Sequence, residues 1–215
     1  MDKVFLDLGG NLGQSVRRFY SEVPDAYTWR IYSFEPIEFD SLVAGTKKYS
    51  NVVCIKAVVG IKEGKTTIYP TGKLQRQGST TEFGKTTGGV LYDNGLEVDE
   101  IDFVKWFKSF VRPGDFVIVK INIEGGEYRL MPYLPKILPQ VSGLYIKLHH
   151  YKFKDLQKSR MIKIYNQFKE QAKQFNTFIY CDAAEGRDSD KGRYKFGWML
   201  KEIEAGNHSV LELVV

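Results

Sequence analysis

Short apolar runs alternate with helical patterns along most of this chain, and this alternation constrains the fold more than any other feature. The first run, at residues 4–8, ends at two glycines, and apolar residues at helical spacing follow between Gly13 and Val23. A second run spans residues 31–34, and Pro36 opens the next helical pattern. Strands separated by helices favour a parallel sheet with helices on both of its faces.

The same alternation continues toward the end of the sequence. Further strands are expected at residues 52–59, 65–69, 115–123, 143–148, 177–181 and 209–215. Further helices are expected at residues 98–111, 127–138 and 155–175. Residues 71–96 interrupt the pattern with six glycines, which is typical of a lid or binding loop and also fits a surface excursion. The charged segment 182–193 is expected to be a solvated turn, with contact to a polar substrate as the alternative.

Composition excludes several classes of protein. With 215 residues, 43% of them apolar and 27% charged, the chain is expected to form one globular domain over residues 1–215. No apolar stretch is long enough to cross a membrane, and the run near Met1 is too short for a signal peptide, so a cytoplasmic location is expected. Cys54 and Cys181 lie in apolar runs as buried thiols, and no spacing of Cys and His suggests a metal site.

The turn after the first strand carries the first chemical signal. Residues 7–13 follow the pattern D-x-G-x-N-x-G, whereas the dinucleotide pattern G-x-G-x-x-G fails because Asn11 and Gln14 stand at its second and third glycines. The carboxylate of Asp7 at the strand end suits an ammonium-bearing ligand better than a pyrophosphate. Glu35, at the end of the second strand, is in position to accept both hydroxyls of a ribose.

Together, the turn and Glu35 resemble the class I S-adenosylmethionine-dependent methyltransferases. Residues 119–127, V-K-I-N-I-E-G-G-E, resemble the K-I-D-x-E-G-x-E signature of the FkbM family of that class. Three further segments resemble the same family, and the resemblance covers residues 3–150. These segments are Y-S-F-E-P at 32–36, the stretch from 51 to 60 with the small strand 66–69, and G-S-T at 78–80 in place of a serine-rich loop.

The resemblance implies a Rossmann-like α/β sandwich of three layers. Its mostly parallel sheet would have seven strands in the order 3-2-1-4-5-7-6, with the last strand antiparallel. The implied cofactor is S-adenosylmethionine, and the implied acceptor is a hydroxyl on a sugar, a glycan or a small metabolite. In this scheme the turn lies near the methionine part, Glu35 holds the ribose and residues 57–58 flank the adenine. The expected cofactor-binding residues are Asp7, Gly9, Asn11, Gly13, Glu35, Ala57, Val58 and Asn122.

Asn122 departs from the family pattern, which has aspartate at this position. Asparagine can form hydrogen bonds but can neither act as a base nor supply charge to a metal ion, so no metal is expected. A hydroxyl acceptor then needs another proton acceptor, and the candidate catalytic residues are His149, His150 and Glu124. Neighbours on a strand point to opposite faces, so at most one of the histidines is expected to face the cleft. Glu127 competes for the same role or simply begins a helix.

Two alternative functions stay open. Asn122 also fits a cofactor-binding protein without transferase activity. The net charge of +5 would fit a nucleic-acid methyltransferase, although the sequence lacks the Asn/Asp-Pro-Pro-Tyr type of loop that methylation of base amino groups usually requires. A small-molecule or glycan acceptor is therefore the expected partner, nucleic acid is the less favoured one, and no membrane is expected.

Overall fold

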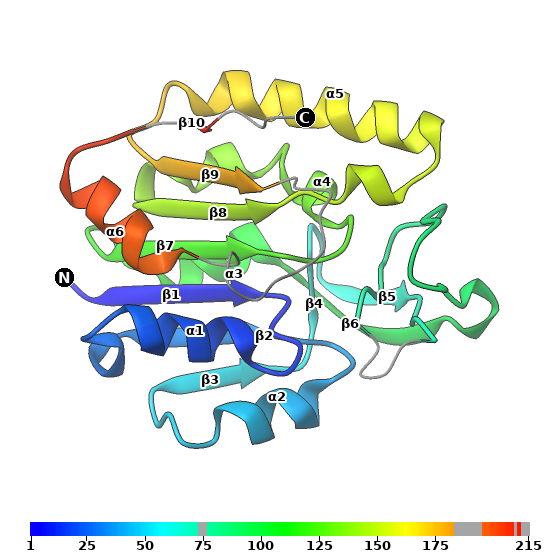
Figure 1. The fold of residues 1–215 in the computed structure, drawn as a ribbon, viewed down its shortest axis with the longest axis horizontal. Helices are drawn as coiled ribbons and strands as arrows, with labels where there is room; N and C mark the ends of the chain where they lie inside the picture. The colour runs from blue at the N-terminus through cyan, green and yellow to red at the C-terminus, as the bar shows by residue number, and fades with distance from the viewer. Residues whose placement is uncertain (73–76, 183–194, 209, 212–215) are drawn as a thin grey trace.

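The computed structural model describes residues 1–72, 77–182, 195–208 and 210–211. A large parallel sheet is covered by helices on both faces, and a small sheet lies beside the carboxyl ends of its strands (Figure 1). Described strands of the large sheet follow the order β3-β2-β1-β7-β8-β9-β10, and each neighbouring pair is parallel. The α/β class and the mostly parallel sheet predicted from the sequence are confirmed.

The strands of the large sheet are β1 (Lys3–Leu8), β2 (Arg30–Phe34), β3 (Val52–Ile55), β7 (Phe116–Ile121), β8 (Gly143–Lys147), β9 (Phe178–Asp182) and β10 (Val210–Leu211). The small sheet has the order β4-β6-β5 and consists of β4 (Val58–Gly60), β5 (Gly64–Ile68) and β6 (Leu96–Asp102). The α-helices are α1 (Gln14–Glu22), α2 (Phe39–Thr46), α3 (Phe103–Phe110), α4 (Glu127–Leu130), α5 (Asp155–Ala172) and α6 (Phe196–Glu204). Short 3-10 helices are η1 (Ala26–Thr28), η3 (Tyr92–Asn94), η4 (Leu134–Lys136), η5 (Leu138–Gln140) and η6 (His150–Lys152).

Strand β1 shows why the central strands read as unbroken apolar runs. Val4, Leu6 and Leu8 point to the face that α3, α4 and α5 cover, where they join the larger of two apolar clusters. Phe5 points to the opposite face and stacks on Phe19 of α1, with ring centroids 4.3 Å apart. Because both faces of the sheet are buried, the alternation of a half-exposed strand is absent here.

The end of the predicted strand order is wrong. The last strand was expected to run antiparallel between two neighbours, but β10 lies at the sheet edge and pairs in parallel with β9, Val210 opposite Ile179. The helix α6, which the sequence did not predict, lies between these two strands in the chain. A helical crossover returns the chain in its original direction, whereas an antiparallel pair is usually joined by a short turn. Residues 212–215 of the predicted strand lie outside the described residues.

Two segments that were each predicted as one element form two elements in the structure. The strand expected at 52–59 ends at Ile55, whose carbonyl accepts from Glu35 N and Ala57 N, and a second strand starts at Val58. The helix expected at 98–111 begins only at Phe103. The residues before it form β6, because they pair with β4 on one side and β5 on the other. This pairing overrides a helix-like apolar spacing.

The glycine-rich segment, defined here as residues 77–96, is joined to the rest of the protein at several points along its length. One isolated bridge joins Tyr69 to Thr80, and another joins Lys85 to Phe153, beyond β8. Residues 73–76 of the predicted loop and residues 183–193 of the predicted charged turn lie outside the described residues. In the part of the chain that the structure describes, no helix combines the length and apolar character needed to cross a membrane.

Candidate functional site

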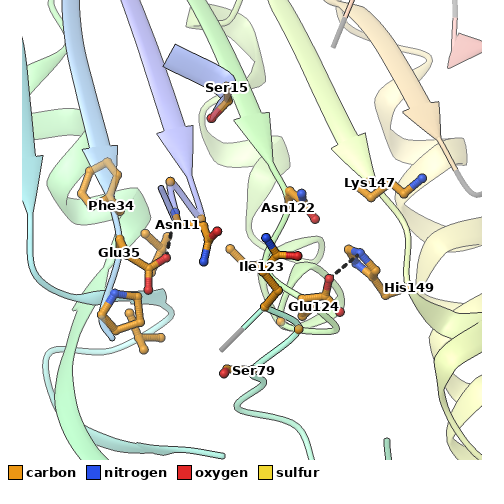
Figure 2. A pocket seen from close by; sticks show the side chains of 18 of the residues that line it. Asn11, Ser15, Phe34, Glu35, Ser79, Asn122, Ile123, Glu124, Lys147 and His149 are labelled. Carbon is orange, nitrogen blue, oxygen red and sulfur yellow. Dashed lines mark hydrogen bonds and ion pairs between the residues drawn. The ribbon is translucent and has the colours of Figure 1, made fainter. Parts of the chain in front are cut away.

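A cavity of about 520 Å³ opens at the carboxyl ends of β1, β2, β7 and β8, and the glycine-rich segment forms one of its walls (Figure 2). This volume lies in the range of pockets that hold small ligands and cofactors. Most residues predicted to form the site line the cavity, namely Gly9, Asn11, Glu35, Ala57, Val58, Asn122, Glu124 and His149. The residues that do not line it are Asp7, Gly13 and His150.

The turn after β1 needs residues that tolerate left-handed backbone. Gly9, Asn11 and Gly13 have φ angles of 86°, 45° and 79°, a region that glycine and asparagine adopt most readily. Gly9 is also constrained by space, because a Cβ atom there would lie 2.2 Å from the carbonyl oxygen of Asn122. The ends of β1 and β7 therefore approach closely at the floor of the cavity.

The backbone N–H groups of this turn are all used inside the protein. Each of the five consecutive N–H groups from Gly9 to Gly13 donates a hydrogen bond to an oxygen of the chain itself. The acceptors are Phe34 O for Gly9 and Gly10, Glu35 Oε2 for Asn11, Gln14 Oε1 for Leu12, and Gly10 O for Gly13. A phosphate-binding turn presents its N–H groups to the ligand, and this turn does not.

The carboxylate of Glu35 is held by three backbone donors at one side of the cavity (Figure 2). Oε1 accepts from the N–H groups of Ile37 at 2.9 Å and Glu38 at 3.0 Å, and Oε2 accepts from Asn11 N at 3.0 Å. A carboxylate offers about four acceptor positions, so one position on Oε2 stays open for a ligand donor. Burial raises the pKa of Glu35 even though these hydrogen bonds act to lower it.

Asp7 does not face the cavity; it lies beneath the turn, on the side away from the cavity, and stabilises it. Its side chain is fully buried, and Oδ1 forms an ion pair with Lys120 Nζ at 2.8 Å. Oδ2 accepts from the hydroxyls of Ser15 at 2.6 Å and Ser33 at 2.8 Å. Lys120 also donates to the carbonyl of Gly9 at 2.8 Å, which ties the turn to β7. Sequence reasoning missed Lys120, although a lysine inside the apolar run of β7 was a usable signal.

Glu124 lies across the cavity from Glu35 and is surrounded by two lysines and a histidine. Its carboxylate is 2.6 Å from Lys85 Nζ, 2.8 Å from Lys152 Nζ and 3.3 Å from His149 Nε2. Burial alone would raise the pKa of Glu124, but His149, Lys85 and Lys152 together hold it well below its usual range. The backbone of Glu124 is left-handed, with φ of 55°, and its carbonyl accepts from Thr80 Oγ1 at 2.7 Å.

His149 lies between two carboxylates. Nδ1 is 3.0 Å from Glu127 Oε1, and Nε2 faces Glu124, as the dashed line in Figure 2 shows. Glu127 is fully buried, and it also accepts from the backbone N–H groups of His149 and Gly125, both at 2.9 Å. Desolvation acts to lower the pKa of His149, but the two carboxylates outweigh it and raise that pKa.

His150 lies away from the cavity, and its Nδ1 is 2.8 Å from the hydroxyl of the buried Tyr128. Only His149 of the two histidines lines the cavity, in agreement with the prediction that at most one would face the cleft. The reason differs from the one expected, because β8 ends at Lys147 and both histidines follow it. Sequence reasoning also missed Lys85 and Lys152, which no pattern links to Glu124.

Comparison with known proteins returns no matching family model, no matching curated protein and no matching solved structure. The resemblance to the FkbM family therefore stays a prediction from the sequence. Within the described residues, no group of three or more His, Cys, Asp and Glu side chains is arranged to hold a metal ion.

Proposed function

We propose that this protein is an S-adenosylmethionine-dependent O-methyltransferase that acts on a hydroxyl of a sugar, a glycan or a small metabolite. The observation that carries the proposal is the use of all five turn N–H groups from Gly9 to Gly13 within the protein, beside the carboxylate of Glu35. A dinucleotide needs such groups for its pyrophosphate. A nucleoside cofactor without phosphates makes no such demand, and a carboxylate can accept from its ribose.

The cavity residues fit such a cofactor. The open acceptor position of Glu35 would bind a ribose hydroxyl, and Ala57 and Val58, buried beside it, would flank the adenine. Asn11 and Asn122 line the cavity at the ends of β1 and β7, where the methionine part would lie. Bound S-adenosylmethionine supplies a methyl group that its sulfonium makes electrophilic.

The remaining chemistry is positioning of the acceptor. Glu124 is the cavity-lining carboxylate nearest the end of β7, and its side chain is 19% exposed. All four of its acceptor positions are used by Lys85, Lys152 and His149. Lys152, which contacts both oxygens and is 21% exposed, would release Oε1, so that Glu124 accepts a hydrogen bond from the acceptor hydroxyl and takes the proton as the new O–C bond makes that oxygen positive. Because Glu124 is a weak base, it aligns the hydroxyl more than it activates it. Such alignment can lower the activation free energy of the transfer by about 7 kcal/mol.

His149 is less suited to the role of base than the sequence indicated. Both of its ring nitrogens face carboxylates, so neither has a lone pair directed at an acceptor. His150 is hydrogen-bonded to Tyr128 and lies outside the cavity. Among the three predicted candidates, the geometry therefore favours Glu124 as the group that touches the acceptor.

A transfer assay tests the proposal. The purified chain is incubated with S-adenosylmethionine labelled in its methyl group and with a panel of sugars, glycans and small hydroxylated metabolites, and the products are analysed by mass spectrometry. Label in a methyl ether supports the proposal, and loss of that label in Glu124→Ala with cofactor binding intact supports the role of Glu124. Cofactor binding without transfer to any acceptor would instead favour the binding protein without transferase activity.

A further inference from the structure

We propose that Lys85 and a protonated His149 are positioning residues that together hold Glu124 for the acceptor, so that the acceptor side of the cavity is complete only when the glycine-rich segment is docked. The role of Glu124 toward the acceptor rests on the proposed function. The arrangement itself rests on the contacts of these side chains alone.

Lys85 of the glycine-rich segment is buried against Glu124. Its side chain is 1% exposed, and its Nζ is 2.6 Å from Glu124 Oε2 and also hydrogen-bonded to the carbonyl of Gly78. The backbone of the same stretch is fastened to the chain beyond β8, because Thr86 N donates to Lys152 O at 2.8 Å. The contact between Thr86 and Lys152 thus places Lys85 beside Glu124 and also fixes the backbone of Lys152, the second lysine that contacts Glu124.

The hydrogen-bond geometry of His149 requires a proton on both ring nitrogens. A neutral imidazole has one N–H and one lone pair. In one neutral tautomer the lone pair on Nε2 would face the carboxylate of Glu124 at 3.3 Å, and in the other the lone pair on Nδ1 would face that of Glu127 at 3.0 Å; both are repulsive. Only the imidazolium donates to both carboxylates.

Two carboxylates and two lysines make up the charged surroundings of His149. Glu124 and Glu127 face its ring, and the ring of Tyr151 is 6.3 Å away. Lys85 contacts Oε2 of Glu124, and Lys152 contacts both of its oxygens. Three cations thus enclose two carboxylates. Loss of the His149 proton at high pH would remove one of the three groups that hold Glu124. The arrangement is therefore lost as pH rises through the pKa of His149, whereas a histidine base would become active in that range.

The backbone of Glu124 gives a reason for so many contacts. Its left-handed conformation is rare outside glycine, and the next residue, Gly125, has φ of 112°. Such a conformation persists only where the surroundings determine it. The lysines, His149 and Thr80 provide these surroundings, and two of them, Lys85 and Thr80, come from the glycine-rich segment.

Titration of the histidine rings by nuclear magnetic resonance tests this inference without cofactor or acceptor. The 15N-labelled full chain has three histidines, so His208→Gln and His150→Gln assign the signals. We expect both nitrogens of His149 to be protonated at neutral pH. Lys85→Met removes a positive charge that shares the carboxylate of Glu124 with His149 and should raise the pKa of His149 by about 0.4–0.5, the effect of a unit charge roughly 6–8 Å away at the dielectric constant of water.

The matched control is Lys154→Met, an exposed lysine on the same connection, which should leave the pKa of His149 unchanged. If Lys85→Met does not fold, Lys152→Met replaces it, because Lys152 contacts the same carboxylate. A His149 ring that is neutral at neutral pH, or a pKa that neither lysine variant moves, would overturn the inference. Because these spectra need no ligand, their outcome is separate from the outcome of the transfer assay.

Discussion

Glu35→Ala is the substitution that most sharply separates a ribose-binding carboxylate from one that only braces a turn. Glu35 is 8% exposed as a residue and borders the cavity, while three backbone N–H groups already occupy both of its carboxylate oxygens. Only the fourth acceptor position, on Oε2, is available for a ribose hydroxyl. The structure thus reduces the two ribose contacts expected from the sequence to one.

The expected loss of affinity follows from that single contact. A hydrogen bond to a charged group contributes about 1.5–3 kcal/mol, which corresponds to a Kd for S-adenosylmethionine about 10- to 150-fold weaker in Glu35→Ala. The N–H groups of Asn11, Ile37 and Glu38 lose their acceptor at the same time, so a lower Tm is also expected. Both quantities must therefore be measured on the same sample.

Isothermal titration calorimetry on folded protein provides the assay, and Glu38→Ala is the matched control. Glu38 lies in the same turn and carries the same charge, but it does not line the cavity, so its substitution should change Kd less than twofold. Affinity in the wild type should also weaken on acidification, because protonation removes the acceptor. Since the pKa of Glu35 is raised, this loss begins at a higher pH than for an ordinary glutamate, and it is absent from Glu35→Ala. Wild-type affinity in folded Glu35→Ala would refute the ribose assignment.

Three further predictions concern the turn, the histidine and the glycine-rich segment. Lys120→Met should lower the free energy of unfolding, measured in urea, by about 3–5 kcal/mol, because it leaves the buried Asp7 carboxylate without its cation. A loss below about 1 kcal/mol would contradict the supporting role of this pair. On a true acceptor, turnover should fall as pH rises through the raised pKa of His149, and His150→Gln should keep that profile; turnover that rises through this range would restore a histidine base. Amide hydrogen exchange in residues 77–96 should slow when cofactor and acceptor bind, and it should be faster in Lys85→Met than in the wild type with or without ligands. Equal exchange rates in all of these samples would contradict the proposed docking of the segment by Lys85.

The fold was predictable where local pattern and final environment agree. The strands β1 and β7 read as apolar runs because both of their faces are buried, and α1 shows one apolar stripe. Prediction failed where pairing partners decide: β6 resembles a helix in sequence but lies between two strands. Such partners are distant in the chain, and helical spacing contains no information about them.

The candidate site divides in the same way. The turn and Glu35 were predictable because positive φ angles and strand ends leave a mark in the local sequence. The contacts of Glu124 were not, because Lys85 is 39 residues away and Lys152 is 28 residues away in the chain. Predicting an electrostatic site whose residues come from separate segments therefore requires the tertiary structure.

Direct titration of the unmodified chain with S-adenosylmethionine and with its demethylated product tests the central claim, that this cavity binds a nucleoside cofactor without phosphates. Calorimetry should show one molecule of either compound bound per chain, with NAD binding far more weakly, because the five N–H groups from Gly9 to Gly13 already donate within the protein. Tighter binding of NAD, or no heat from either S-adenosyl compound at millimolar concentration, would contradict the account.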